Sequence, residues 1–385
     1  MKPSHKSTCK NLKGVLLIAP GLSLPSTLWM RRQLDMISDK VSYLFTDIKS
    51  APDYKKTYNV VTINTGTGKV LRRACHYINL IRLFRAIHSA HVGVVLIHFA
   101  TTAVTYKKII LTTNKPVVVH CHGFDVTWNL KDPATGTPSH GERYVDQVSS
   151  MPDNVVFIGN SKRTIQKLLD IGIPHDRIVL KYLGVDVPEM FPEKSRRFDK
   201  LNVLYLGRLI DFKGPDIVIR AFEKACLMGF DGELVIAGDG PLRITCELLI
   251  AHSPIKKRIK LLGAVDGEKG KELMAEADIF TAHNCLGPLS GQEEAFGVTT
   301  IEAMASGVAI VNANSGSIPE LIEDGVSGIL VNSSDIEGHA EAFLRLQKDP
   351  KLRLTIAKNA WERVRTNFSR ELESRNLRDI LSLDA

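Results

Sequence analysis

Two glutamates lie close together in the stretch "EAFGVTTIEAMASG", where seven residues separate Glu294 from Glu302. Gly297 allows a tight turn, after which residues 298–300 begin a short helix. The N–H groups at a helix start have no partner within the helix, so they form a site for an anion. Glu294 precedes the turn and Glu302 lies one turn inside the helix. Both carboxylates can therefore accept hydrogen bonds from hydroxyls that flank a bound anion.

A second set of charged residues stands in "YLGRLIDFKGPDIVI" (205–219). Arg208 directly follows an apolar run, and Lys213 precedes a helical pattern. An Arg fork and a Lys point charge suit a phosphate or a diphosphate, although a solvated loop would also tolerate them. Together with the helix start, they suggest a ligand with an anionic middle and hydroxylated ends. A nucleotide sugar is such a molecule.

Several other chemistries lack their motifs. The sequence has no G-x-x-x-x-G-K-[ST] and no G-x-G-x-x-G after its first apolar run, which argues against Walker-type ATP binding and dinucleotide binding. It has no Asp-x-Asp and no H-E-x-x-H, so a carboxylate-held metal has no evident position. No G-x-S-x-G elbow is present. We therefore expect no metal and no cofactor other than the substrate.

The elements that would position these residues alternate along the chain. Short apolar runs separated by amphipathic segments predict parallel sheets covered on both faces. A charged, Pro-containing stretch at 186–200 divides them into two βα series, and 129–150 is predicted to be a loop. The runs are 14–20, 41–47, 92–100, 115–123 and 154–161, then 201–207, 232–238, 259–265, 277–283, 308–314 and 327–332. Ligands bind at the carboxyl ends of such strands, so the cleft between two domains is the expected site.

Charge is distributed unevenly over the 385 residues. Residues 1–200 hold 29 Lys and Arg against 15 Asp and Glu, whereas 201–385 hold 21 against 27. The basic half favours an anionic partner such as membrane lipid or a phosphorylated acceptor over a merely solvated surface. Nucleic acid is not expected, because no stacking aromatics are interleaved with the charges.

The segment 69–88 contains a basic amphipathic helix. Val70, Ala74, Tyr77, Ile78, Ile81 and Phe84 form one stripe, and the basic residues lie largely elsewhere. Packing of the stripe on the sheet is one interpretation. Docking of the helix on the anionic inner face of a membrane is the other.

The six cysteines and the first apolar run bear on location. The cysteines are widely spaced and contain no C-x-x-C pair, which favours reduced thiols and a cytoplasmic protein, at most peripheral on the membrane. The first apolar run stops at Pro20 and Gly21 without an A-x-A-like site, so we expect a strand there instead of a signal peptide. No apolar run reaches the roughly 18 residues of a membrane span.

Further stretches surround the charged residues: "VIAGDGPLR" (235–243), "SGSIPELIEDGVSGILV" (315–331) and "HCHGFDVT" (120–127). Together with Glu294, Glu302 and "GRLIDFKG" (207–214), they resemble the retaining glycosyltransferases of family four, of the exopolysaccharide or colanic-acid type. The resemblance is strong over about 201–335 and looser over 1–200. It implies the GT-B fold, an α/β architecture in which two Rossmann-like βα domains face each other across a cleft.

The resemblance also implies domain bounds and residue roles. Residues 1–190 would bind the acceptor, 200–365 would bind the nucleotide sugar, and a helix within 366–385 would cross back to the first domain. The implied catalytic residues are Arg208 and Lys213 on the diphosphate, Glu294 on the sugar hydroxyls and His122 over the sugar from the opposite domain, in a loop shaped by Asp125. The implied donor-binding residues are Gly21 in a glycine loop, Ala264 and Val265 beside the base, Phe296, Gly297, Val298 and Thr299 around the sugar and phosphate through backbone N–H groups, and Glu302 on the ribose.

The expected function is metal-independent transfer of a hexose, with retention, from a UDP- or GDP-sugar to a glycan or lipid-linked acceptor in polysaccharide or glycoconjugate biosynthesis. A sugar-nucleotide epimerase or a phosphorylase of the same fold and a non-catalytic glycan-binding subunit are the alternatives. His283-Asn284 and "CLGPLSGQE" (285–293) depart from the family pattern, which leaves the sugar open. Glu302 also has a structural alternative, because Thr299 and Glu302 have the spacing of a helix capping box.

Overall fold

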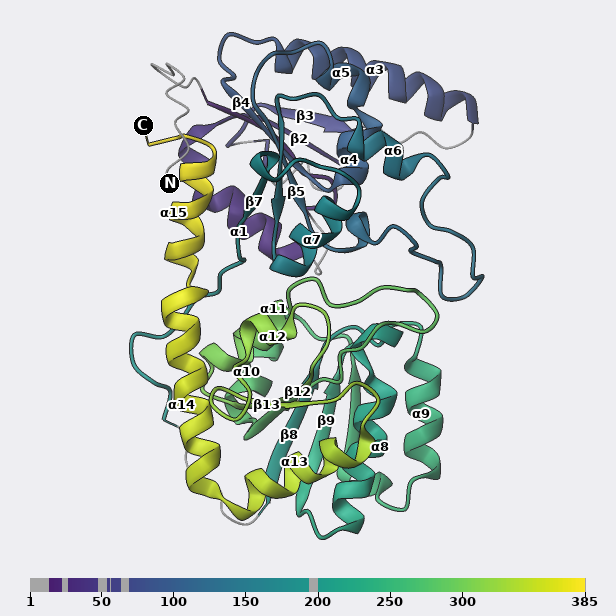
Figure 1. Cartoon of the computed structure of the whole chain (residues 1–385), viewed down its shortest axis with the longest axis vertical. Helices are drawn as coiled ribbons and strands as arrows, with labels where there is room; N and C mark the ends of the chain where they lie inside the picture. Colours follow the sequence, from purple (N-terminus) through teal and green to yellow (C-terminus); the bar gives the residue numbers. More distant parts are fainter. Residues whose placement is uncertain are drawn as a thin grey trace.

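The protein consists of two α/β domains, each built on a parallel sheet (Figure 1). The structure is a computed structural model, and it describes residues 14–22, 27–47, 54–55, 57–63, 69–193 and 200–384. The predicted α/β class with two βα domains is confirmed.

The N-terminal domain contains a seven-stranded sheet in the order β3-β2-β1-β4-β5-β6-β7. Its strands are β1 Val15–Ile18, β2 Val41–Asp47, β3 Val60–Ile63, β4 Val94–His98, β5 Val117–Cys121, β6 Val155–Gly159 and β7 Ile178–Leu180. Its helices are α1 Leu28–Met36, α3 Lys69–Ile87, α4 Ala100–Thr105, α5 Lys107–Ile110, α6 Tyr144–Ser149 and α7 Lys162–Asp170. Strands β1, β4 and β5 are buried along their whole length, as expected for a sheet covered on both faces.

The C-terminal domain repeats this plan with a six-stranded sheet in the order β10-β9-β8-β11-β12-β13. Its strands are β8 Leu201–Leu206, β9 Gly232–Ala237, β10 Ile259–Gly263, β11 Ile279–Thr281, β12 Ala309–Ala313 and β13 Ile329–Val331. Its helices are α8 Pro215–Leu227, α9 Arg243–His252, α10 Gly267–Glu276, α11 Val298–Ala305, α12 Ile318–Leu321, α13 Ile336–Lys348 and α14 Pro350–Asn367, and α15 Arg370–Ile380 follows. Short 3₁₀ turns stand at η2 Ser38–Lys40, η3 Phe124–Val126, η4 His175–Arg177, η5 Asp211–Lys213 and η6 Lys256–Arg258.

Local sequence sets where several helices begin. The side chains of Ser161, Asp266 and Asp335 accept hydrogen bonds from N–H groups in the first turns of α7, α10 and α13. Asp349 caps α14 in the same way, and Pro350 occupies the first helical position, where its missing N–H costs nothing.

The last two helices connect the domains. Helix α14 lies along the C-terminal domain, and α15 continues beside the N-terminal domain (Figure 1). Leu377, Leu381 and Leu383 join the buried cluster that contains Val15 and Leu17 of β1. The chain end therefore belongs to the hydrophobic core of the N-terminal domain.

Three local expectations were wrong or incomplete. The short strands β3 and β7 were not predicted, and the predicted loop at 129–150 contains α6. Four of the six residues in the stripe on α3 do not pack on the sheet. Tyr77, Ile78, Ile81 and Phe84 are exposed, while Leu83 and Ile87 enter the core.

Candidate active site

The loops that follow strands of the two sheets meet between the domains. Gly123 follows β5, and a Cβ placed on it would lie 2.5 Å from the Cβ of Ala295 in the opposite domain. Only glycine permits that approach, and its φ of +118° also excludes most side chains. The predicted His-Gly stretch of one domain therefore touches the segment between Glu294 and Phe296 of the other.

Lys213 and Glu294 form an ion pair after strands β8 and β11. The Lys213 ammonium donates to the Glu294 carboxylate, and Asn284 Nδ2 lies 3.5 Å from the same oxygen. Gly214 follows with φ +58°, and a Cβ there would lie 2.3 Å from the carbonyl oxygen of His283. The loop can approach this closely only with glycine, which brings Lys213 to Glu294.

Arg208 is the exposed cation of the pair predicted for the diphosphate. Its guanidinium carbon lies 5.9 Å from the centre of the Phe212 ring, and the Lys213 ammonium lies 5.6 Å from the same ring. Among the described residues, Arg208 has no acidic partner within ion-pair distance. Its charge is therefore available to an anionic ligand.

The helix start predicted to bind an anion is present as α11. Gly297 has φ +90° and precedes the first helical residue. Among the described residues, the N–H groups of Val298 and Thr299 have no acceptor, whereas Thr300 N–H donates to the Gly297 carbonyl at 3.0 Å. Two of the three predicted donors thus remain available. The Phe296 side chain is buried against Tyr182 and Phe368, so only its backbone can face a ligand.

Glu302 pairs with Arg32 of the other domain instead of capping α11. Both terminal nitrogens of Arg32, on α1, lie 3.1 Å from Glu302 Oε1. Gly297 is the N-cap of α11, and no side chain caps the helix, so the capping-box explanation of Glu302 is wrong. Burial raises the pKa of Glu302, and the facing Arg32 lowers it in part. The sequence alone could not predict this contact, because Arg32 and Glu302 lie 270 positions apart.

His122 lies in a loop organised by a buried carboxylate. Asp125 accepts hydrogen bonds from the N–H groups of His122, Gly123 and Ala100, at 2.8, 3.0 and 2.8 Å. The His122 ring lies against the Trp29 ring, tilted by 34°, with 3.9 Å between ring centres. The loop after β5 is therefore fixed in place before any ligand binds.

The remaining predicted donor residues follow strands β1 and β10. Gly21 N–H donates to Asp47 Oδ2 at 2.7 Å, which fixes the turn after β1. Ala264 is exposed and Val265 is half-buried, and both lie between β10 and the Asp266 cap of α10. The structure thus places each at the carboxyl end of a strand.

Two further glutamates, which the sequence did not identify as interdomain residues, connect the domains. Glu293 accepts from Arg163 at 2.7 Å and from Lys167 at 2.9 Å, both on α7. Glu320 accepts from the N–H groups of Lys162 and Arg163 at the start of α7. The Glu320 side chain therefore caps a helix of the other domain.

The unusual segment 285–293 is held by a buried aspartate. Asp211 accepts hydrogen bonds from the N–H groups of Leu289 and Ser290 and from the Ser290 hydroxyl, at 2.9, 2.7 and 2.9 Å. The Ser290 carbonyl then accepts from Lys131 N–H of the other domain at 2.9 Å. The segment is therefore an ordered bridge over the domain boundary.

His283, the other departure from the family pattern, belongs to a fully paired chain of hydrogen bonds. Ser334 N–H donates to its Nε2 at 2.8 Å, so its Nδ1 carries the proton and donates to His339 Nδ1 at 2.8 Å. His339 Nε2–H then donates to the Thr281 hydroxyl at 2.7 Å. Burial lowers the pKa of His283 to about 4 and that of His339 well below its usual value.

Acid should therefore destabilise the protein between about pH 6.5 and pH 4. In that range the unfolded chain binds a proton at residue 283 that the folded chain does not, so stability falls as the pH falls. At pH 5 the loss from His283 is roughly 2 kcal/mol relative to neutral pH. Urea unfolding at both pH values should show a smaller difference for His283→Gln than for wild type. An unchanged difference, or an equal reduction in the exposed control His252→Gln, would contradict this assignment.

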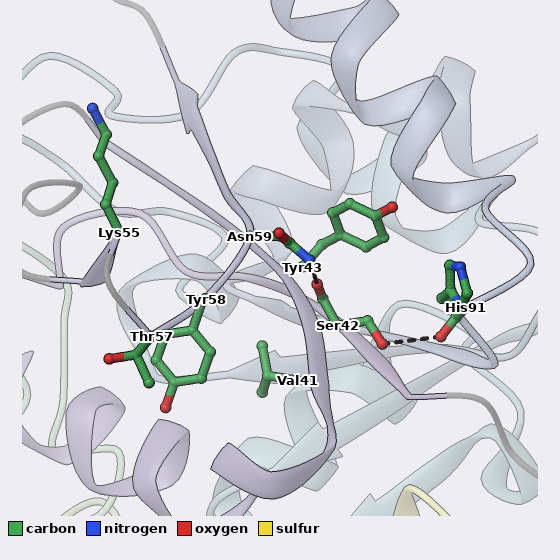
Figure 2. Close-up of a pocket in the computed structure, with 8 residues that line it drawn as sticks. All are labelled: Val41, Ser42, Tyr43, Lys55, Thr57, Tyr58, Asn59 and His91. Carbon is green, nitrogen blue, oxygen red and sulfur yellow. Dashed lines mark hydrogen bonds between the residues drawn. The ribbon is translucent and has the colours of Figure 1, made fainter.

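A groove of about 490 Å³ lies elsewhere in the N-terminal domain (Figure 2). It is lined by Val41, Ser42, Tyr43, Lys55, Thr57, Tyr58, Asn59 and His91. Val41 begins β2 and Asn59 immediately precedes β3, so the groove lies at the amino ends of these strands. The groove therefore lies at the opposite end of the strands from the predicted site, which is at their carboxyl ends.

Residues 186–363 match the family model described as glycosyl transferases group 1. The amylovoran biosynthesis glycosyltransferase AmsK of Erwinia amylovora is 31% identical over 230 residues, which cover 59% of this chain and 56% of that relative. The chain thus spans little more than half the length of this curated relative. The putative colanic acid biosynthesis glycosyltransferase WcaL of Escherichia coli is 25% identical over 294 residues, covering 75% of this chain and 70% of WcaL.

Among solved structures, HepE of Anabaena in complex with UDP has a TM-score of 0.76 and 18% identity, and the alignment covers 96% of this chain and all of HepE. At this identity the likeness shows a shared fold. Within the described residues, no helix is both long and apolar enough to cross a membrane. Residues 186–363 therefore carry the similarity to the glycosyl transferases group 1 family, and the two facing βα domains have the GT-B fold.

Proposed function

We propose that the protein is a retaining glycosyltransferase that moves a sugar from a nucleoside diphosphate sugar, UDP- or GDP-linked, to a glycan or lipid-linked acceptor in polysaccharide or glycoconjugate biosynthesis. The observation that carries the proposal is the grouping of Lys213, Glu294 and the start of α11 opposite the His122 loop. The names of AmsK and WcaL support polysaccharide biosynthesis. The complex of HepE with UDP supports a nucleotide donor.

The charged residues would act on the departing diphosphate. As the bond between the sugar and the phosphate breaks, negative charge grows on the phosphate oxygens. Arg208, the Lys213 ammonium and the N–H groups of Val298 and Thr299 would donate hydrogen bonds to these oxygens. Glu294 would accept hydrogen bonds from sugar hydroxyls, Glu302 from the ribose, and His122 would lie over the sugar. For retention, the acceptor would attack on the face that the diphosphate leaves, and a phosphate oxygen would take the acceptor proton.

The direct test is incubation with UDP- and GDP-sugars, with and without acceptors. The proposal expects acceptor-dependent release of the nucleoside diphosphate and a glycosylated product. An epimerised donor or a sugar phosphate as the product would instead favour the epimerase or the phosphorylase. Donor binding without turnover on any acceptor would favour the non-catalytic glycan-binding subunit. Thermal stabilisation by each donor identifies which nucleotide to use first.

Turnover should survive excess EDTA. The cations proposed for the diphosphate are side chains and helix N–H groups, and the sequence has no Asp-x-Asp. The measurement is the initial rate of nucleotide release before and after removal of metal. Complete loss of activity that Mg²⁺ or Mn²⁺ restores would exclude the role assigned to Arg208 and Lys213.

The N-terminal domain is proposed to dock on an anionic membrane surface through α3. Tyr77, Ile78, Ile81 and Phe84 are exposed along this helix, and Arg82 and Arg85 are exposed beside them. Exposed apolar residues flanked by cations suit the interface of an anionic bilayer. Each cation near such a surface contributes about 1 kcal/mol.

Joint replacement of Arg82 and Arg85 by Gln should weaken binding to vesicles that contain an anionic phospholipid by roughly tenfold or more. Donor binding should be unchanged, because α3 contributes no residue to the proposed site. The matched control is Lys256→Gln with Lys257→Gln, which removes two exposed charges from the C-terminal domain. If both double variants bind vesicles equally well, α3 does not dock on the membrane and has only a structural role.

A further inference from the structure

Three histidines gather where β4 and β5 end. His98 is the last residue of β4 and pairs in register with His120 of β5, so both side chains point to the same face of the sheet. His122 lies two residues after His120 and continues on that face. One ring nitrogen from each of the three lies within 4.8 Å of the other two.

The hydrogen bonds of this cluster leave one nitrogen of each ring without a partner. His98 Nδ1 lies 3.1 Å from His122 Nε2, and His120 Nδ1 lies 3.2 Å from Gln33 Oε1. His98 Nε2, His120 Nε2 and His122 Nδ1 are buried and have no hydrogen-bond partner in the described structure. An unpaired buried polar atom typically costs about 1–3 kcal/mol. The ring nitrogens that face each other are His98 Nδ1 and His122 Nε2, so His120 Nε2 is the unpaired nitrogen that supports a ligand shared by the three rings.

A second layer of hydrogen bonds orients His120. Gln33 Nε2 donates to Glu373 Oε1 at 2.7 Å, so the Gln33 carbonyl oxygen faces His120 and accepts its Nδ1–H. His120 Nε2 therefore presents a lone pair. Lys181 donates to the same Glu373 oxygen at 2.6 Å, which neutralises the nearby ammonium. An outer shell that ends in a carboxylate and fixes the histidine tautomer is typical of histidine metal ligands.

We propose that His98, His120 and His122 bind one divalent transition-metal ion, for which Zn²⁺ is the best fit. An imidazole-only set suits Zn²⁺, Ni²⁺ or Cu²⁺ and not Mg²⁺ or Ca²⁺. Two nitrogens that bind Zn²⁺ at tetrahedral angles lie about 3.4 Å apart, close to the 3.1 Å between His98 Nδ1 and His122 Nε2. Three protein ligands leave a fourth position for water. His122 is the half-buried member, so the ion would enter from its side.

This ion has no part in the chemistry proposed for the diphosphate. It would instead hold the His122 ring, which is proposed to lie over the donor sugar, and so reduce transfer. Zn²⁺ binding would thereby inhibit the enzyme. Binding of the ion requires neither donor nor acceptor, so it can be tested without any assay of transfer.

The test is a titration of the EDTA-treated full-length protein with Zn²⁺ in competition with a chromophoric chelator. Wild type should bind one ion, and Co²⁺ in its place should show the visible absorption of a four-coordinate site. His98→Gln and His120→Gln should weaken binding by well over tenfold, and the outer-shell change Gln33→Leu by roughly tenfold. The matched control His175→Gln, at an exposed histidine of the same domain, should bind as wild type does.

Circular dichroism shows whether each variant folds. If the buried changes prevent folding, the Co²⁺ spectrum of wild type and its loss in His122→Ala decide the matter. Failure of wild type to bind Zn²⁺ at micromolar concentrations would overturn the proposal. Binding that survives the ligand variants, or that His175→Gln removes, would overturn it as well. Where transfer can be measured, Zn²⁺ should inhibit wild type and not His98→Gln; a protein that binds Zn²⁺ without transferring sugar would contradict the proposed function alone.

Discussion

Replacement of Lys213 by Gln should lower kcat by roughly 10²–10³, the usual cost of losing one preorganised donor to a developing anion. The Lys213 ammonium is the nearer of the two proposed diphosphate cations to Glu294, with which it forms an ion pair. Gln keeps much of the side-chain length but removes the charge. Steady-state rates of nucleotide release, with donor and acceptor varied in turn, measure the effect.

The matched control for this change is Lys224→Gln. Lys224 lies on α8 of the same domain and pairs with Glu337 at an exposed position, so its loss should leave kcat near that of wild type. A Lys213→Gln enzyme with an unchanged kcat and a raised KM would show that Lys213 contributes to donor binding equally before and during the reaction. An enzyme unchanged in both constants would remove Lys213 from the site.

The sequence predicted the fold because its central strands have a clear pattern. Five apolar runs in the first half and six in the second each correspond to an observed strand. The short strands β3 and β7 were missed, since "VVTI" and "IVL" carry too few apolar residues to stand out. The carboxyl-end rule then predicted where Arg208, Lys213 and the α11 start would lie.

The helix α3 shows where periodicity fails. A stripe of apolar residues indicates one face of a helix but not what covers that face. Here the helix buries Leu83 and Ile87 and exposes Ile81 and Phe84. Apolar residues occur on both sides, so the pattern alone could not choose between the sheet and the solvent.

The long-range partners could not be predicted, because they join residues far apart in the chain. Arg32 and Glu302, Lys167 and Glu293, and Gln33 and Glu373 meet only once both domains have folded and α15 has crossed back. The histidine cluster had a weak signal in His120-x-His122, which places two side chains on one face of a strand. No sequence pattern indicated that His98, on the neighbouring strand, belongs to the same cluster.

The ion pair between Arg32 and Glu302 bears on the activity expected of a Glu302 variant. We expect Glu302→Gln to lose roughly tenfold or more in kcat/KM while its melting temperature stays within a few degrees of wild type. A carboxylate can accept from two ribose hydroxyls, and a charged hydrogen bond contributes about 1.5–3 kcal/mol against roughly 1 for a neutral one. At about 1.4 kcal/mol per decade, that difference corresponds to the expected loss. Glu294→Gln should behave similarly through its contacts to the sugar.

The competing explanation is that Glu302 serves only to hold the domains together through Arg32. The variant Arg32→Gln separates the two, since it removes the same ion pair and leaves the carboxylate in place. If Glu302 binds the ribose, Arg32→Gln should keep most of kcat/KM, and the donor should no longer have to displace the guanidinium from the carboxylate. If the ion pair alone matters, Arg32→Gln, Glu302→Gln and the double variant should all lose the same amount, because the pair is lost only once. That equality in kcat/KM would show that the ribose assignment of Glu302 is wrong.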